Sequence, residues 1–251
     1  MIIKQFIGHS GATVNLVENE LGTVVEKSGT GIERNYNRIT SLTGVVDQPQ
    51  ILAYDGDTLT MEYIQNQDIQ HYLINGEHKK LTRFIKTVYD KFVRLPTSAK
   101  DYTSVYERRL SSVSWLPTTI DNLMDCLPRH LAQTVYHGDL TCNNILYDYN
   151  NSRFVLIDAV DIDLDSVHFD ISKLRQDIDC GWFLRDSDAL LSNRLLSIRQ
   201  SLSEHCEYYN NNAMAILCLL RVWTYSTEQE NKWKYYGETN EYYYIGSWSK
   251  Q

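Results

Sequence analysis

The first 65 residues alternate between short apolar segments and polar turns. Segments that contain apolar, often β-branched residues occupy positions 2–7, 14–17 and 23–27, and glycine-containing turns separate them. This pattern predicts antiparallel strands. The pair Asp55-Gly56, between two further apolar runs, predicts a hairpin within residues 45–66. We therefore expect a small lobe built on a five-stranded antiparallel sheet.

One segment of this lobe has helical rather than alternating periodicity. In residues 31–42, Ile32, Tyr36 and Ile39 recur at the spacing of one helical face. Glu33 lies in the first turn of the predicted helix. The lobe is therefore expected to carry a single helix after its third strand.

Beyond residue 66 the apolar spacing becomes helical for most of the chain. Within residues 67–95, apolar side chains share one face and the run ends before Pro96, as helices tend to. Near the C-terminus a second such face is formed by Ala213, Ile216, Leu217, Leu220 and Trp223. The pattern predicts an α+β protein with an N-terminal lobe at residues 1–65 and a larger, mostly helical lobe at residues 66–251.

Composition and charge exclude several function classes. The chain has 251 residues and a net charge of −8, and no basic stripe suggests a nucleic-acid partner. Its five cysteines form no C-x-x-C pair, so neither a disulfide framework nor a zinc site is expected. The apolar run at the N-terminus is too short for a signal peptide, and no apolar run approaches the length of a membrane span. We expect a cytoplasmic protein without a membrane partner, and the oligomeric state stays open.

The candidate catalytic and metal-binding residues lie between positions 135 and 158. A polar loop between two apolar runs carries Asp139 and, five residues later, Asn144, and the next apolar run ends at Asp158. A carboxylate that accepts the proton of an attacking hydroxyl, together with two oxygen ligands for Mg²⁺, is the set that phosphoryl transfer needs. Asp139 fits the first role, and Asn144 and Asp158 fit the second. A turn that is rich in Asp and Asn by chance is the simpler alternative.

The residue pattern of this stretch resembles that of a known enzyme family. The run H-G-D-x-x-x-x-N-I-L, from His137 to Leu146, followed by the I-D pair at Asp158, is similar to the aminoglycoside phosphotransferase and choline kinase-like family of small-molecule kinases. The resemblance implies a two-lobed, protein-kinase-like fold, ATP and Mg²⁺ as cofactors, and a small-molecule hydroxyl as acceptor. It also implies that Asp170, in the D-I-S-K-L phrase, caps a helix and braces the catalytic loop.

The N-terminal lobe supplies the candidate nucleotide residues. The turn containing Gly8, Ser10 and Gly11 lies between the first two predicted strands and could present backbone N–H groups to phosphates, although a plain hairpin turn explains it as well. Lys27 ends the third predicted strand, where the kinase pattern has its phosphate-pairing lysine.

Two further parts of the nucleotide site are expected in the same lobe: an acidic partner for Lys27 and a hinge that contacts the base. Glu33 is the nearby acid on a predicted rigid element that could hold the flexible Lys27 side chain, and a solvated surface pair is the alternative. By the resemblance, the segment Met61-Glu62-Tyr63-Ile64 is the hinge, where the Glu62 C=O and the Ile64 N–H would bind the adenine edge.

Several functional alternatives remain open at this level. The acidic run after Asp158 could recruit a cationic substrate or face water, and the aromatic C-terminal tail could cage a quaternary ammonium or pack onto the helices. A protein kinase is one rival function, although the chain lacks an A-P-E element after Asp158. A nucleotide-binding regulatory module without transfer activity is the other.

Overall fold

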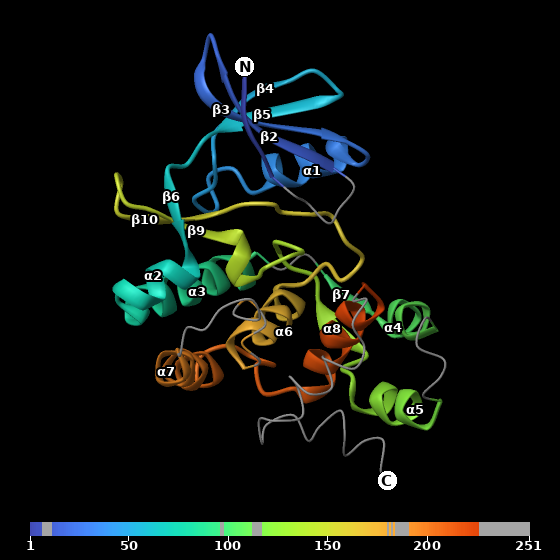
Figure 1. Cartoon of the computed structure of the whole chain (residues 1–251). Coiled ribbons are helices and arrows are strands. Elements are labelled where there is room, and N and C mark those ends of the chain that lie inside the picture. Colours follow the sequence, from blue (N-terminus) through green and yellow to red (C-terminus); the bar gives the residue numbers. More distant parts are fainter. Residues whose placement is uncertain are drawn as a thin grey trace. The chain divides into compact units, whose positions relative to one another are not determined.

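The computed structural model describes residues 1–6, 12–95, 98–111, 117–179, 181, 183 and 191–225. The chain divides into two compact units (Figure 1). The first contains residues 1–75 and 143–161, and the second contains residues 76–142 and 162–251. This division does not follow a single cut at residue 65, because a hairpin from the middle of the chain belongs with the N-terminal residues. Among the described residues, no helix has both the length and the apolar character required to cross a membrane.

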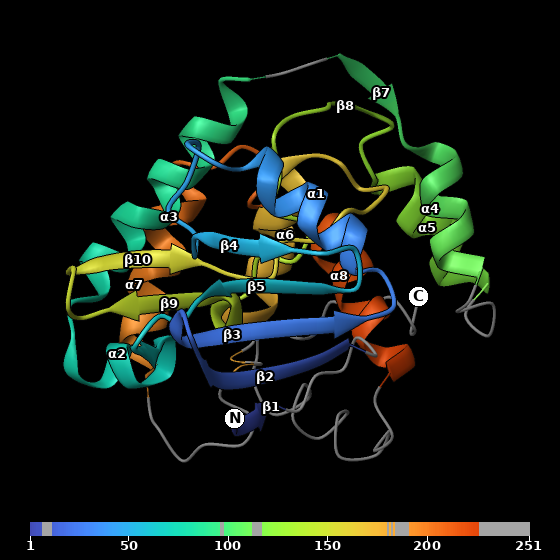
Figure 2. The same ribbon diagram turned by 90° about the horizontal axis from the view of Figure 1, so that it is seen from above.

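The first unit is built on the predicted five-stranded antiparallel sheet. Its strands are β1 (Ile2–Phe6), β2 (Ala12–Asn19), β3 (Gly22–Gly29), β4 (Ile51–Tyr54) and β5 (Thr58–Glu62). They lie in the order β1-β2-β3-β5-β4, which Figure 2 shows from above. The predicted hairpin between β4 and β5 is present, and the Asp55 carboxylate accepts the backbone N–H groups of Asp57 and Thr58 in its turn. Helix α1 (Ile32–Ser41) lies against β3 and β5. The predicted N-terminal architecture is therefore confirmed.

A second, smaller sheet completes this unit and was not foreseen. It contains β6 (Asn66–Asp68), β9 (Ile145–Asp148) and β10 (Arg153–Leu156) in the order β10-β9-β6. Helix α2 (Ile69–Asn75) packs on it through Tyr72, whose ring centroid lies 4.5 Å from that of Tyr147 and 5.0 Å from that of Phe154. This packing attaches the β9–β10 hairpin to the N-terminal residues.

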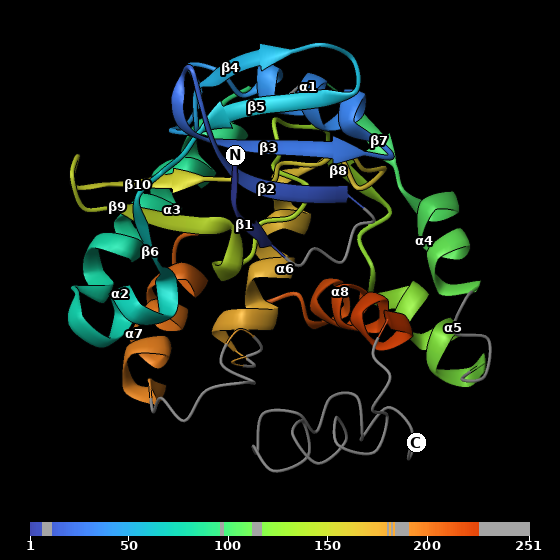
Figure 3. The same cartoon turned by 45° about the horizontal axis from the view of Figure 1, so that its top comes forward.

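The second unit is mostly helical, as predicted. Its helices are α3 (His78–Val93), α4 (Thr103–Leu110), α5 (Pro117–Cys126), α6 (Val167–Ile178), α7 (Ser192–Ser203) and α8 (Asn212–Tyr225). Strands β7 (Ala99–Asp101) and β8 (His130–Ala132) pair to form a two-stranded sheet. Helix α6 lies between α7 and α8 (Figure 3). The predicted apolar face of α8 is buried at Ala213, Ile216, Leu217 and Leu220. These residues pack in one core with Tyr102, Tyr106 and Phe169.

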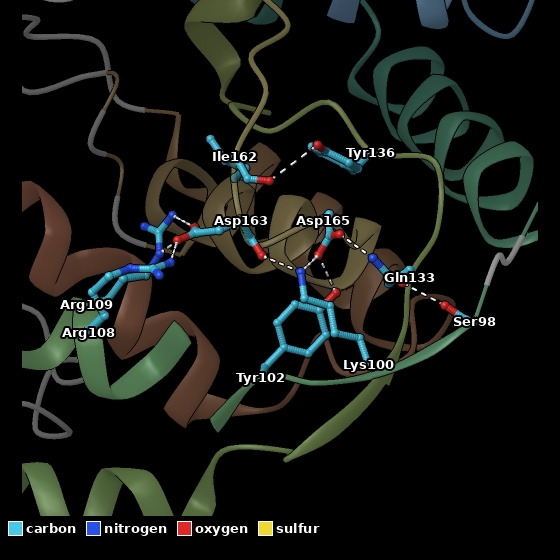
Figure 4. Close-up of polar contacts among 10 residues, drawn as sticks. All are labelled: Ser98, Lys100, Tyr102, Arg108, Arg109, Gln133, Tyr136, Ile162, Asp163 and Asp165. Atoms are coloured by element: carbon cyan, nitrogen blue, oxygen red, sulfur yellow. Dashed lines mark hydrogen bonds and ion pairs between the residues drawn. The ribbon is translucent and has the colours of Figure 1, made fainter. Parts of the chain in front are cut away.

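A polar network holds the segment that leads into α6 (Figure 4). The Asp165 carboxylate accepts hydrogen bonds from Lys100 at 2.6 Å, from the Tyr102 hydroxyl at 2.9 Å and from Gln133. Two residues earlier, Asp163 pairs with both Arg108 and Arg109. The chain between residues 162 and 166 is therefore tied to α4 and to the β7–β8 sheet by charged groups.

The same partners keep both carboxyl groups ionised. Burial by itself raises the pKa of Asp165, but the hydrogen bonds from Lys100, Gln133 and Tyr102 outweigh burial and hold this pKa below its ordinary value. The pKa of Asp163 is also below its ordinary value. Burial raises this pKa, but the hydrogen bonds and charges of Arg109 and Arg108 lower it by more. A carboxyl group with a depressed pKa stabilises the fold above its unfolded pKa, and this stabilisation is lost as the pH falls through the folded pKa.

We expect Asp165→Asn to lower the melting temperature at pH 7, because Lys100 loses its anionic partner. The difference from the wild type should begin to shrink as the pH falls below about 4, the ordinary pKa of the unfolded chain, and should vanish once the pH has fallen through the lower folded pKa. Thermal unfolding recorded from pH 2 to 8 measures both effects. Asp125→Asn, an exposed change in α5 of the same unit, is the matched control. An Asp165→Asn protein as stable as the wild type at pH 7 would contradict the assigned role.

Candidate functional site

Lys27 and Asp158 meet in the first unit, although 131 residues of chain separate them. Strand β3 turns Lys27 inward, and its side chain is 7% exposed. The ammonium Nζ lies 2.5 Å from Oδ1 of Asp158, whose side chain is 47% exposed. The predicted phosphate lysine and the predicted metal ligand are therefore direct neighbours.

The hairpin register explains how Asn144 comes to lie beside Asp158. Leu156 of β10 pairs with Ile145 of β9, and one step further the Ile157 N–H donates to the Asn144 C=O at 3.0 Å. Asn144 and Asp158 thus flank the same end of the hairpin. One or two oxygen-bearing side chains are what Mg²⁺ accepts from a protein when phosphates and water complete its coordination. The donor set present here fits this ion.

The backbone at Asp158 is unusual for a residue with a side chain. Its φ of 59° lies in the left-handed region, which Asp and Asn tolerate better than most residues do. Such conformations cost free energy and persist where the surrounding structure imposes them. The next residue provides the restraint: the Ala159 C=O accepts a hydrogen bond from the buried Asn35 amide at 2.6 Å.

The structure does not show the expected pairing of Lys27 with Glu33. Glu33 lies on the exposed side of α1, whereas Ile32, Asn35 and Ile39 are buried. Positions 33 and 35 are roughly 200° apart around a helix, so they cannot face the same neighbour. Asn35 is the inward polar residue, and the sequence contained a signal for it, namely its i+3 spacing from Ile32. The partner of Lys27 is Asp158.

Glu62 and Ile64 line a polar cavity of about 420 Å³ in the first unit. The cavity is bounded by Thr23, Glu62, Tyr63, Ile64, Gln65, Asp148, Asn150 and Asn151. The Glu62 side chain is engaged on its own sheet, where Oε2 accepts the Gln50 N–H at 3.1 Å. Backbone recognition of adenine at Glu62 and Ile64 therefore stays a prediction. Gly8, Ser10 and Gly11, the candidate phosphate turn, lie outside the described residues, as does the aromatic C-terminal tail.

Asp139 lies in the second unit, on a loop that α6 holds in place. The Asp170 carboxylate of α6 accepts the backbone N–H groups of His137 and of Gly138, the latter at 2.8 Å. Lys173 of the same helix forms an ion pair with Asp139. One turn further, Asp177 accepts the Cys142 N–H at 2.6 Å.

These contacts confirm one half of the expectation for Asp170 and correct the other. Asp170 is buried and does brace the loop that carries Asp139. It does not cap the helix, because α6 begins at Val167 with Ser166 at the N-cap position. A carboxylate in the first turn of a helix can also contact another segment. Here the Asp170 carboxylate accepts hydrogen bonds from the N–H groups of the loop.

The glycine and the histidine of the H-G-D run each have a structural reason. Gly138 adopts φ 86°, which a residue with a Cβ adopts only under strain. His137 is fully buried, and its Nδ1 accepts the Asp139 N–H at 3.3 Å. Burial, followed by the Asp177 charge, raises the pKa of the Cys142 thiol in the same loop. This thiol stays protonated and is not a nucleophile.

The structure also decides what much of the acidic run does. Asp163 and Asp165 pair with cations of their own unit, and Asp170 and Asp177 bind the catalytic loop. Asp179 pairs with Arg175 and accepts the Tyr209 hydroxyl. These carboxylates are used within the protein, so they do not form a solvated field for attracting a cationic substrate.

Comparisons with known proteins agree with this geometry. Residues 77–198 match the sequence model of the phosphotransferase enzyme family. No curated protein matches the chain.

Solved structures match almost the whole chain at low identity. An aminoglycoside-3'-phosphotransferase of type VIII is 16% identical, with 88% of this chain and 92% of that chain covered and a TM-score of 0.55. A thermostable mutant of aminoglycoside phosphotransferase APH(4)-Ia, in a ternary complex with AMP-PNP and hygromycin B, is 11% identical, with 98% and 91% covered and a TM-score of 0.60.

An ethanolamine kinase from Plasmodium vivax is 13% identical, with 90% of this chain and 78% of that chain covered and a TM-score of 0.52. At such identities the likeness establishes the fold. The resemblance inferred from the sequence is thereby confirmed. Residues 77–198 match the phosphotransferase enzyme family, and the chain has the fold of solved aminoglycoside phosphotransferases, which is the protein-kinase-like fold that was expected.

Proposed function

We propose that the protein transfers the terminal phosphoryl group of ATP to a hydroxyl group of a small molecule, with Mg²⁺ as the metal cofactor. The observation that carries this proposal is the contact between Lys27 and Asp158. Kinases bind their nucleotide with a lysine that contacts phosphate oxygens and a carboxylate that binds the metal ion. The structure brings two residues of these types together from distant segments of the chain.

The residues divide the work between nucleotide and acceptor. Asn144 and Asp158 would hold Mg²⁺, which neutralises phosphate charge when it is bound. Lys27 would pair with phosphate oxygens, and the Glu62 C=O and Ile64 N–H would contact the base. Asp139 would accept a hydrogen bond from the acceptor hydroxyl and orient its oxygen for attack. No covalent enzyme intermediate is needed.

The structure gives one reason to prefer a small acceptor over a polypeptide. The segment between Asp158 and α6 is only residues 159–166, and the chain lacks an A-P-E element after Asp158. Asp163 and Asp165 tie this segment down to Arg109 and Lys100. Aminoglycosides, sugars and amino alcohols are therefore the acceptor classes to test first.

We expect Asp139→Asn to reduce kcat by about 10²- to 10⁴-fold, because the amide can no longer accept the hydroxyl proton. Nucleotide affinity should change little, since Asp139 is assigned to the acceptor. The measurement is Mg²⁺-dependent ADP release with a panel of sugars, amino alcohols and aminoglycosides. Asp121→Asn, an exposed change in α5, is the control for the loss of one carboxylate. An Asp139→Asn enzyme with full turnover would remove Asp139 from the mechanism.

Asp158→Ala should act on a different step, the metal-dependent part of nucleotide binding. In the wild type, Mg²⁺ should strengthen the thermal stabilisation that AMP-PNP produces. The variant should lose this increment because one of the two proposed metal ligands is gone. Differential scanning fluorimetry with AMP-PNP, with and without Mg²⁺, makes the comparison. An increment equal to that of the wild type would show that the metal is held elsewhere.

A further inference from the structure

We propose that Lys173 is a positioning residue for the transfer reaction: its ammonium group holds the Asp139 carboxylate in one orientation. This inference rests on the proposed function, because it assigns Lys173 a task in the same site. It adds a residue that the sequence pattern did not single out, since Lys173 lies 34 positions from Asp139.

The first observation is the regular arrangement of three charged residues on α6. Asp170, Lys173 and Asp177 occupy positions i, i+3 and i+7, so they share one face of the helix. Each contacts a different part of the loop: Asp170 the first amides, Lys173 the Asp139 carboxylate and Asp177 the Cys142 amide. One rigid helix face thus specifies the loop conformation from residue 137 to residue 142.

The middle contact differs in kind from the outer two. Asp170 and Asp177 bind backbone N–H groups, which is sufficient to brace the loop at both ends. Lys173 binds a side chain, and it is the side chain proposed to touch the acceptor hydroxyl. The loop from His137 to Asn144 contains no lysine or arginine of its own. The positive charge beside Asp139 is therefore delivered from the helix.

The surroundings of Lys173 confine its otherwise flexible side chain. Its neighbours Ser172 and Leu174 are fully buried, and the Lys173 side chain is 14% exposed. An ammonium group loses solvation in such a place, and an apolar side chain of similar size often serves stability as well or better. The Asp139 side chain is 30% exposed, so water can solvate this carboxylate when the lysine is removed. The pair is therefore poorly explained by stability and well explained by the orientation of a reacting group.

The chemical consequence follows from the charge. An adjacent cation favours the ionised form of a carboxylate and strengthens its hold on one orientation. The acceptor hydroxyl then meets a hydrogen-bond acceptor in a fixed orientation rather than one that rotates.

Lys173→Met tests this role, because it keeps an unbranched side chain of nearly the same length and removes the charge. We expect kcat to fall by about 10²-fold. The KM for ATP and the melting temperature should stay close to those of the wild type. Lys173→Arg should recover much of the lost kcat, since it restores a cation. Lys100→Met is the matched control: it breaks a lysine–aspartate pair of the same unit, at 2.6 Å from Asp165, and should lower stability without lowering kcat.

The double variant Asp139→Asn/Lys173→Met tells whether Lys173 acts through Asp139. If it does, Lys173→Met should cost almost nothing further in the Asp139→Asn background, because residues that act as a unit are not additive. Fully additive losses would overturn the proposal, as would a Lys173→Met enzyme with wild-type kcat. A wild-type protein without turnover on any acceptor would overturn the proposed function as well. An active wild type with an equally active Lys173→Met variant would overturn this inference alone.

Discussion

The burial of charged groups on α6 is the constraint on which the loop that carries Asp139 depends. This helix lies inside the second unit, and nearly all of its residues are buried. Charged groups in such a place are stable only when each is paired and hydrogen-bonded. Asp170 and Asp177 accept backbone N–H groups of the loop from residue 137 to residue 142, and Lys173 forms an ion pair with Asp139, so the helix and the loop stabilise each other's conformation.

In the first unit, the candidate nucleotide and metal residues are held in place mainly by backbone hydrogen bonds. Hydrogen bonding along the β9–β10 hairpin sets Asn144 beside Asp158, and Asn35 of α1 restrains the following residue through the Ala159 C=O. The left-handed backbone at Asp158 is held between these contacts. The pair of Lys27 and Asp158 therefore depends on a sheet, a hairpin and a helix that come from three parts of the chain.

The use of the acidic residues changes the view of the acceptor. By composition the protein is acidic, and an acidic cleft would attract a polycationic acceptor. In the second unit, however, Asp163, Asp165 and Asp179 are already paired with arginine or lysine. Electrostatic attraction by this part of the chain is therefore a weak basis for choosing an aminoglycoside over a neutral sugar.

The sequence by itself determined the fold class and the chemical motif. Alternating and helical periodicities separated the antiparallel sheet from the helices, because side-chain direction repeats every two residues in a strand and every 3.6 in a helix. The spacing of His137, Asp139, Asn144 and Asp158 was readable because these residues are close together in the chain. Only the tertiary structure decided that Asn35 rather than Glu33 faces inward and that Lys27 pairs with Asp158. It also decided that Lys173 pairs with Asp139. These contacts join residues far apart in the chain, and local periodicity predicts that a helix has faces without specifying which distant side chain each face will meet.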